Sequence, residues 1–262
     1  MHIAGYIASL FIGISLGLIG GGGSILTIPV LVYLFGISPV LATSYSLFIV
    51  GSTSLAGAFN SWRKDMLNFK TAFLFGISSI ITVFITRKII VHNIPEVITI
   101  GNTSISFAVL TMVLFALLML LASVSMIRKE HVEVNDNDHE NHFIKLIVYG
   151  IGIGLVTGFL GAGGGFLLIP ALVLVLHLPM KKAVGTSLLI IALNSLTGFI
   201  ADTGHFKIDW IFLLTISVIA ITGVFIGGLF SKKINSEKLT KAFGWFVLLM
   251  GIYIIIKEVW FS

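Results

Sequence analysis

Two glycine-rich segments carry the residue pattern with the clearest chemical potential in this sequence. GGGGS (residues 20–24) and GAGGG (residues 161–165) each interrupt an otherwise apolar run. Glycine inside a helix costs about 1 kcal/mol relative to alanine, so each segment predicts a break in a helix. Backbone N–H groups at such a break, and the positive dipole end of the helix that follows, favour an anion. The predicted anion-binding backbone positions are Gly21, Gly22, Gly23, Ser24, Gly163, Gly164 and Gly165.

Hydroxyl and amide side chains recur at one spacing in the apolar segment that follows each glycine run. Positions i, i+7, i+8 and i+11 hold Ser46, Thr53, Ser54 and Gly57 in the first copy, and Ser187, Asn194, Ser195 and Gly198 in the second. This spacing places them on one face of a helix. Donors on that face suit an oxyanion, and the alternative is hydrogen bonding between packed helices. The predicted substrate-binding side chains are Tyr45, Ser46, Ser54, Thr186, Ser187, Asn194 and Ser195.

The sequence pattern predicts no catalytic or metal centre. It contains no cysteine, and no constellation of nucleophile, base and acid stands out. The glycine runs lack the Lys-Ser/Thr of a nucleotide-binding loop. The histidines of RKEHVEVNDNDHENH (residues 128–142) lie on no predicted helix that would fix them as ligands, so this stretch is interpreted as a solvated linker. Asp65, Asp202 and Asp209 fall at the ends of apolar segments, where they indicate neither a cation site nor a proton relay. We therefore predict no enzyme, no metal and no cofactor.

The elements that must position these groups are apolar helices in a lipid bilayer. The 262 residues are 57% hydrophobic and 10% charged, whereas soluble domains carry about 25% charged residues. The basic residues come in short groups between apolar runs, which is typical of membrane loops rather than of a nucleic-acid surface. Most apolar segments have the roughly 17–25 residues that cross a bilayer as a helix. They cover residues 3–19, 25–35, 39–61, 69–86, 104–127, 143–160, 166–178, 183–201, 210–230 and 239–260.

The second half of the chain repeats the first. Pro29 and Pro170 lie 141 residues apart, and residues 17–69 share 16 of 53 positions with residues 158–210 at that offset. Glycine, proline and serine matches in one ungapped register indicate duplication. The expected units are a first transmembrane repeat (1–127), the linker (128–142) and a second transmembrane repeat (143–262). Repeated halves with glycine-interrupted segments are typical of transporter binding sites.

Loop charges favour halves of opposite orientation. If each glycine-broken segment crosses the membrane once, the lysines and arginines divide eight against eight; if it forms a hairpin, they divide twelve against four. The positive-inside rule favours the second arrangement. The predicted fold is an all-α polytopic membrane protein of two inverted-topology repeats, each a glycine-broken helical hairpin followed by three transmembrane helices. Both termini, Arg87 and the loop near Ser38 are expected on the extracytoplasmic side, and the 128–142 linker on the cytoplasmic side.

Four motifs resemble the TauE/SafE sulfite exporter family of membrane transporters. They are GGGGSILTIP (residues 20–29), GAGGGFLLIP (161–170), AVGTSLLIIALNSLTG (183–198) and HFKIDW (205–210), and the similarity covers nearly the whole chain. The resemblance implies export of small sulfur-containing anions, such as sulfite, sulfoacetate or related organosulfonates, across the cytoplasmic membrane. The first half departs from the pattern, because ATSYSLFIVGSTSLAG (42–57) lacks the Gly-Thr pair. The competing interpretation is a non-transporting structural or sensory membrane protein whose glycines only pack helices.

Overall fold

The computed structural model describes residues 2–95, 97–100, 103–127, 142–174, 178–205, 207–230 and 236–260. Nearly all of them are helical. The first half forms α1 (His2–Ile19), the 3-10 turn η1 (Gly21–Leu26), α2 (Thr27–Tyr33), α3 (Pro39–Trp62), α4 (Phe69–Ile85), the π-helical turn η2 (Thr86–Val91) and α5 (Phe107–Ile127). The second half forms α6 (His142–Leu160), α7 (Gly165–Leu174), α8 (Met180–Asp202), α9 (Trp210–Phe230) and α10 (Ser236–Trp260). The linker predicted at 128–142 lies outside the described residues except for His142.

The predicted helical fold is confirmed, with one short hairpin as the exception. β1 (Val97–Ile100) and β2 (Thr103–Ser106) pair antiparallel between η2 and α5, with Val97 opposite Ser106. The sequence VITI-GN-TSIS explains the difference, because β-branched residues flank a Gly-Asn pair of the kind that forms tight turns. The fifth apolar segment, expected to become helical at residue 104, therefore becomes helical at Phe107.

The helices suit a lipid environment on their outer faces. Within the described ranges, five are long and apolar enough to cross a membrane: α3, α4 with η2, α5, α8 and α9. Large apolar side chains remain exposed on the outside of the bundle, including Ile3, Phe73, Leu121, Ile211 and Leu229. Lipid rather than water is the solvent that such a surface requires.

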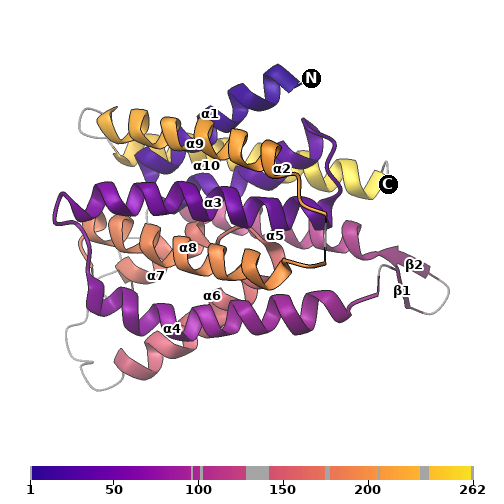
Figure 1. The fold of residues 1–262 in the computed structure, drawn as a ribbon, viewed down its shortest axis with the longest axis horizontal. Coiled ribbons are helices and arrows are strands. Elements are labelled where there is room, and N and C mark those ends of the chain that lie inside the picture. The colour runs from indigo at the N-terminus through magenta and orange to yellow at the C-terminus, as the bar shows by residue number, and fades with distance from the viewer. Residues whose placement is uncertain are drawn as a thin grey trace.

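α3 and α8 pack against each other in the middle of the bundle, with α9 and α4 on opposite sides of the pair (Figure 1). They run antiparallel: a Cβ atom added at Gly57 near the end of α3 would contact Leu188 near the start of α8. At the other end of the pair, a Cβ atom at Gly198 would contact Leu47. Leu188 and Gly198 stand 141 positions after Leu47 and Gly57, so each copy contacts the other at the corresponding residue.

Two further helix pairs repeat one packing contact between the halves. A Cβ atom at Gly17 of α1 would clash with the carbonyl oxygen of Val224 in α9. A Cβ atom at Gly158 of α6 would lie 3.2 Å from the carbonyl oxygen of Val83 in α4. Gly158 and Val224 each stand 141 positions from their counterparts, Gly17 and Val83. The duplication in sequence is thus also a duplication in packing, with small residues letting the helices approach closely.

The glycine-broken segment of the first half folds back on itself. The ring of Phe35, which follows α2, packs against Gly5 at the start of α1. α1 and α2 therefore form a helical hairpin whose two open ends lie together and whose tip is the glycine run. The extended chain after α2 makes its turn through Gly36, whose φ is 70°.

Candidate functional site

The two glycine breaks meet each other at the junction of the halves. A Cβ atom added at Gly21 would lie 2.5 Å from the Cα atom of Gly165, and one at Gly165 would lie 2.5 Å from the Cα atom of Gly21. The side chain of Ile191 in α8 also reaches Gly21. Only glycine allows two backbones to approach this closely. The structure thus brings together Gly21 and Gly165, which the sequence predicted separately as anion-binding positions.

The two breaks begin alike, with a glycine of positive φ, and then differ. Gly20 and Gly161, which stand at corresponding positions, have φ angles of 78° and 70°. Each N–H donates to the carbonyl oxygen four residues earlier, Leu16 and Thr157 respectively, at 2.9 Å. A left-handed glycine of this kind ends a helix. Gly163 and Gly164 continue the positive φ in the second break, at 69° and 66°.

Three of the predicted serines are buried with unused hydrogen-bonding capacity. The hydroxyls of Ser46, Ser54 and Ser195 have no hydrogen-bond partner among the described residues. Ser195 faces the second break directly, because a Cβ atom on Gly163 would lie 3.1 Å from its Oγ. Buried hydroxyls normally find a partner, so unpaired ones at a helix break are candidates to bind a ligand.

Two predicted residues, Tyr45 and Thr186, anchor helices. The N–H of Asp209 donates to the hydroxyl of Tyr45 at 2.8 Å, and the N–H of Asn68 donates to Thr186 Oγ1 at 3.0 Å. Asp209 and Asn68 are in turn hydrogen-bonded to N–H groups in the first turns of α9 and α4. The two anchors occupy corresponding positions in the two copies.

The remaining predicted binding residues form hydrogen bonds within the bundle or lie in η1. Ser24 donates to the carbonyl of Gly21 at 2.7 Å, and Ser187 donates to the carbonyl of Val184 at 2.8 Å. Asn194 Nδ2 donates to Ser79 Oγ at 2.6 Å, while Asn194 Oδ1 has no partner among the described residues. Gly22 and Gly23 lie in η1, between the end of α1 and α2.

A buried ion pair between Arg87 and Asp202 lies beside the second break, and the sequence analysis did not predict it. Arg87 Nη1 donates to Asp202 Oδ2 at 3.1 Å and to Thr43 Oγ1 at 3.1 Å. The Arg87 and Asp202 side chains are each 1% exposed. The sequence placed both residues in or near loops. The available signal was an arginine in the apolar run ITRKII, since a charge inside a membrane segment is by default functional.

Local structure explains why these two charges pair. Asp202 ends α8, where the negative end of the helix dipole opposes a carboxylate. The cation Arg87 offsets that unfavourable placement. η2 extends α4 by a π-helical turn, which carries Arg87 beyond the predicted end of the segment. His92, which follows η2, lies with its Nε2 3.9 Å from Asp202 Oδ1, and its ring stacks on His205 at 3.7 Å between centroids.

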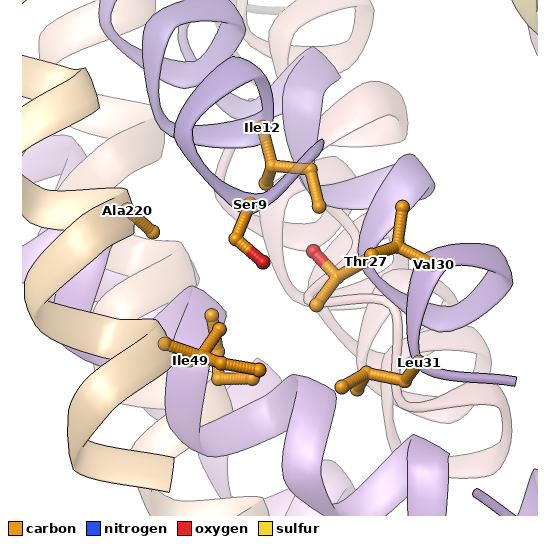
Figure 2. Close-up of a pocket in the computed structure, with 8 residues that line it drawn as sticks. Ser9, Ile12, Thr27, Val30, Leu31, Ile49 and Ala220 are labelled. Carbon is orange, nitrogen blue, oxygen red and sulfur yellow. The ribbon is translucent and has the colours of Figure 1, made fainter. Parts of the chain in front are cut away.

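A small apolar pocket lies apart from this cluster, between α1, α2, α3 and α9 (Figure 2). Its lining includes Ile12, Leu31 and Ile49, and it is too narrow to hold a water molecule. The hydroxyl oxygens of Ser9 and Thr27 point toward each other across it. Ser9 donates to the carbonyl of Gly5 at 2.8 Å. We assign this pocket to helix packing, because aliphatic side chains form most of its walls.

An apolar helical bundle with a charged, hydroxyl-rich interior where two duplicated halves meet defines a multi-pass integral membrane protein. Residues 6–254 match the family described as sulfite exporter TauE/SafE, and the chain belongs to that family of membrane transporters. The resemblance seen in the glycine motifs is thereby confirmed.

Curated relatives carry names that fit the family. A "Probable membrane transporter protein" of Xylella fastidiosa (strain 9a5c) is 29% identical over 250 residues, covering 93% of this chain and 91% of the relative. The "Probable membrane transporter protein YunE" of Bacillus subtilis (strain 168) is 28% identical over 255 residues, covering 91% and 89%. No solved structure matches the chain.

Proposed function

We propose that this transporter exports a small sulfur oxyanion, such as sulfite or a related organosulfonate, across the cytoplasmic membrane. The carrying observation is the contact between the two glycine breaks at the junction of the halves, where the buried hydroxyl of Ser195 faces the second break and has no partner among the described residues. Hydroxyl and backbone N–H donors solvate an oxyanion and replace the water it loses on entering the bundle.

The charge near the breaks also supports an anionic substrate. The guanidinium of Arg87 lies beside Gly161, because a Cβ atom there would lie 2.5 Å from Arg87 Nη2. The nearby carboxylate, Asp202, is already bonded to Arg87. Export of an anion from a negative cell interior is favoured by about 2.3 kcal/mol per charge per 100 mV, so the membrane potential is a sufficient driving force.

The proposal includes two repeats of inverted topology, with both termini extracytoplasmic. Its support is the antiparallel packing of the corresponding helices α3 and α8, together with the hairpin that α1 and α2 form. Twelve of the sixteen lysines and arginines then fall on one side. Alternating exposure of a site by movement of one repeat against the other is the mode that such architectures use.

Cysteine labelling tests this topology, since the chain has no cysteine of its own. Ser38 and Lys64 are both exposed, and they lie at the starting and finishing ends of α3. A membrane-impermeant thiol reagent added to intact cells is expected to label Ser38→Cys and to spare Lys64→Cys until the cells are opened. The reverse pattern would contradict the proposed orientation.

Counterflow in proteoliposomes tests the function. Vesicles loaded with sulfite, thiosulfate, sulfoacetate or sulfate receive a labelled trace of the same anion outside, and protein-free vesicles serve as the control. Saturable accumulation of sulfite or an organosulfonate, weaker for sulfate, is the expected result. Saturation with none of the four anions would overturn the proposal.

A further inference from the structure

We propose that Arg87 binds the transported anion directly and that Asp202 is its internal competitor, holding the guanidinium until an oxyanion displaces the carboxylate. The inference rests on the proposed function in taking the ligand to be a small oxyanion. It adds the residue that recognises the charge and a carboxylate that keeps this residue neutralised when no anion is bound.

The guanidinium of Arg87 has donors to spare. Nη1 serves both Thr43 and Asp202, while Nε and Nη2 are buried and have no hydrogen-bond partner among the described residues. An arginine offers five N–H groups in a planar fork that matches two oxygens of one anion. A buried arginine whose fork is only partly used is costly for the protein unless a ligand completes it.

The site is built from both halves of the chain. Arg87 belongs to η2 and Thr43 to α3 in the first half, whereas Asp202 ends α8 in the second. Gly161, at the second break, presents its bare Cα beside Arg87 Nη2, and a Cβ atom there would also lie 2.6 Å from the carbonyl oxygen of Thr43. An anion on Arg87 would therefore lie at the second glycine break, between groups from both halves.

The displaced carboxylate has an imidazole within reach. Asp202 Oδ1 lies 3.9 Å from His92 Nε2, and protonated His92 can take over the carboxylate when the anion takes Arg87. The Nδ1 atom of His92 contacts the carbonyl oxygen of Arg87 at 2.6 Å, which ties the imidazole to the same turn of backbone. The exchange then moves partners rather than leaving a buried charge alone.

The corresponding positions in the other copy carry no such pair. Residues 141 positions away from Arg87, Asp202 and Thr43 are Gly228, Ser61 and Val184. The charge-recognising site is therefore off the axis that relates the halves, on the side of the Gly161 break. In the proposed topology this is the extracytoplasmic side, where an exported anion leaves.

Binding of sulfite to the purified protein in lipid nanodiscs, measured by calorimetry, tests the exchange. Asp202→Asn keeps the guanidinium and removes its competitor, so its affinity for sulfite is expected to rise about tenfold or more. Its melting temperature without anion is expected to fall, and sulfite should raise that temperature more than it does for the unmodified protein. If the ion pair is purely structural, Asp202→Asn will lower the melting temperature, but sulfite will not raise it more than it does for the unmodified protein.

One further variant is expected to lose sulfite binding, and another serves as the control. Arg87→Gln combined with Asp202→Asn removes both charges, so it avoids a lone buried carboxylate and is expected to fold but to lose sulfite binding. Lys88→Gln changes the adjacent, exposed cation and should leave the affinity unchanged. Equal or weaker binding by Asp202→Asn, or unchanged binding by the double variant, would overturn the inference.

The proposed function can stand while this inference fails. If the double variant still carries sulfite in proteoliposomes as the unmodified protein does, the transport proposal survives and the role given to Arg87 is wrong. If the unmodified protein neither binds nor carries any of the four anions, both proposals are wrong.

Discussion

Gly20 and Gly161 stand at corresponding positions in the two glycine breaks, but the side chains beside them differ in chemistry. Both glycines end a helix with positive φ and the same hydrogen bond to the residue four positions earlier. A Cβ atom at Gly20 would meet the side chains of Val184 and Ile169, whereas one at Gly161 would meet Thr43 and Arg87. The duplication thus repeats the glycine that ends the helix without repeating the charge beside it.

The helix anchors show the same geometry being kept while chemistry changes. A phenol at Tyr45 and a hydroxyl at Thr186 each accept the backbone N–H that precedes the next helix. Packing fixes where a hydrogen bond must be, and several side chains can supply it. Arg87 and Asp202 have no such equivalents, because Gly228 and Ser61 take their places. The symmetric features of the fold therefore serve helix packing, and the asymmetric pair distinguishes one side of the junction from the other.

Gly163→Val gives the largest expected effect, since Gly163 lies inside the second glycine break and faces Ser195. The φ of Gly163 is 69°, and a Cβ atom there would lie 2.7 Å from Val50 Cγ1. Valine at such a φ costs about 1–3 kcal/mol before any clash is counted. Sulfite counterflow is expected to fall to the level of protein-free vesicles, and Gly22→Val, at the corresponding position, should do the same.

Gly152→Ala is the matched control for these glycine variants. Gly152 lies in α6 with no atom within 4 Å of an added Cβ, so the variant should transport as the unmodified protein does. The amount of inserted protein is measured for each variant. Full transport by inserted Gly163→Val and Gly22→Val would show that the breaks are only packing devices.

The stabilities of Asp202→Asn and Ser61→Ala compare the two corresponding positions, one with an ion pair and one without. Leaving Arg87 buried without its carboxylate is expected to cost roughly 3–5 kcal/mol of unfolding free energy. Ser61 at the corresponding position is uncharged and forms no ion pair, so its truncation should cost about 0.5 kcal/mol or less. Thermal unfolding in nanodiscs without added anion measures both. Equal losses would mean that the ion pair is no more than an ordinary contact.

Tyr45→Phe and Thr186→Val are expected to have the smallest effects on stability and transport. Each change removes one hydrogen bond to a helix start, and each should cost about 1 kcal/mol of stability. Transport should persist in both variants, because both hydroxyls serve the start of a helix. Loss of sulfite counterflow in Thr186→Val alone would return Thr186 to the substrate-binding face where the sequence placed it.

The sequence was most informative where one physical rule acts locally. Apolar runs and glycine breaks predicted α3 as 39–61 and α9 as 210–230, and the helices are Pro39–Trp62 and Trp210–Phe230. The β1–β2 hairpin was missed because residues 87–103 were left outside the apolar segments and residues 104–106 were assigned to the helix that follows. β-branching and the Gly-Asn pair were the signals that distinguished it.

The charged part of the site was beyond local rules. Arg87 and Asp202 are 115 residues apart, and their contact depends on how α4 and α8 pack. Counting charges along the chain assigned Arg87 to a loop, because the predicted apolar segment ended at residue 86 whereas the helical structure continues through η2 to Val91. The glycine-to-glycine contact was foreseeable only in outline, since the internal repeat predicts that equivalent segments meet but not which residues touch.

Sulfite counterflow by the Arg87→Gln/Asp202→Asn double variant is the most direct test of the central claim. The unmodified protein and Lys88→Gln are expected to accumulate labelled sulfite to the same saturable level in proteoliposomes. The double variant is expected to remain at the level of protein-free vesicles although it inserts and unfolds cooperatively. Saturable counterflow by the double variant at the unmodified rate would contradict the account, since anion passage would then need neither charge beside the glycine junction.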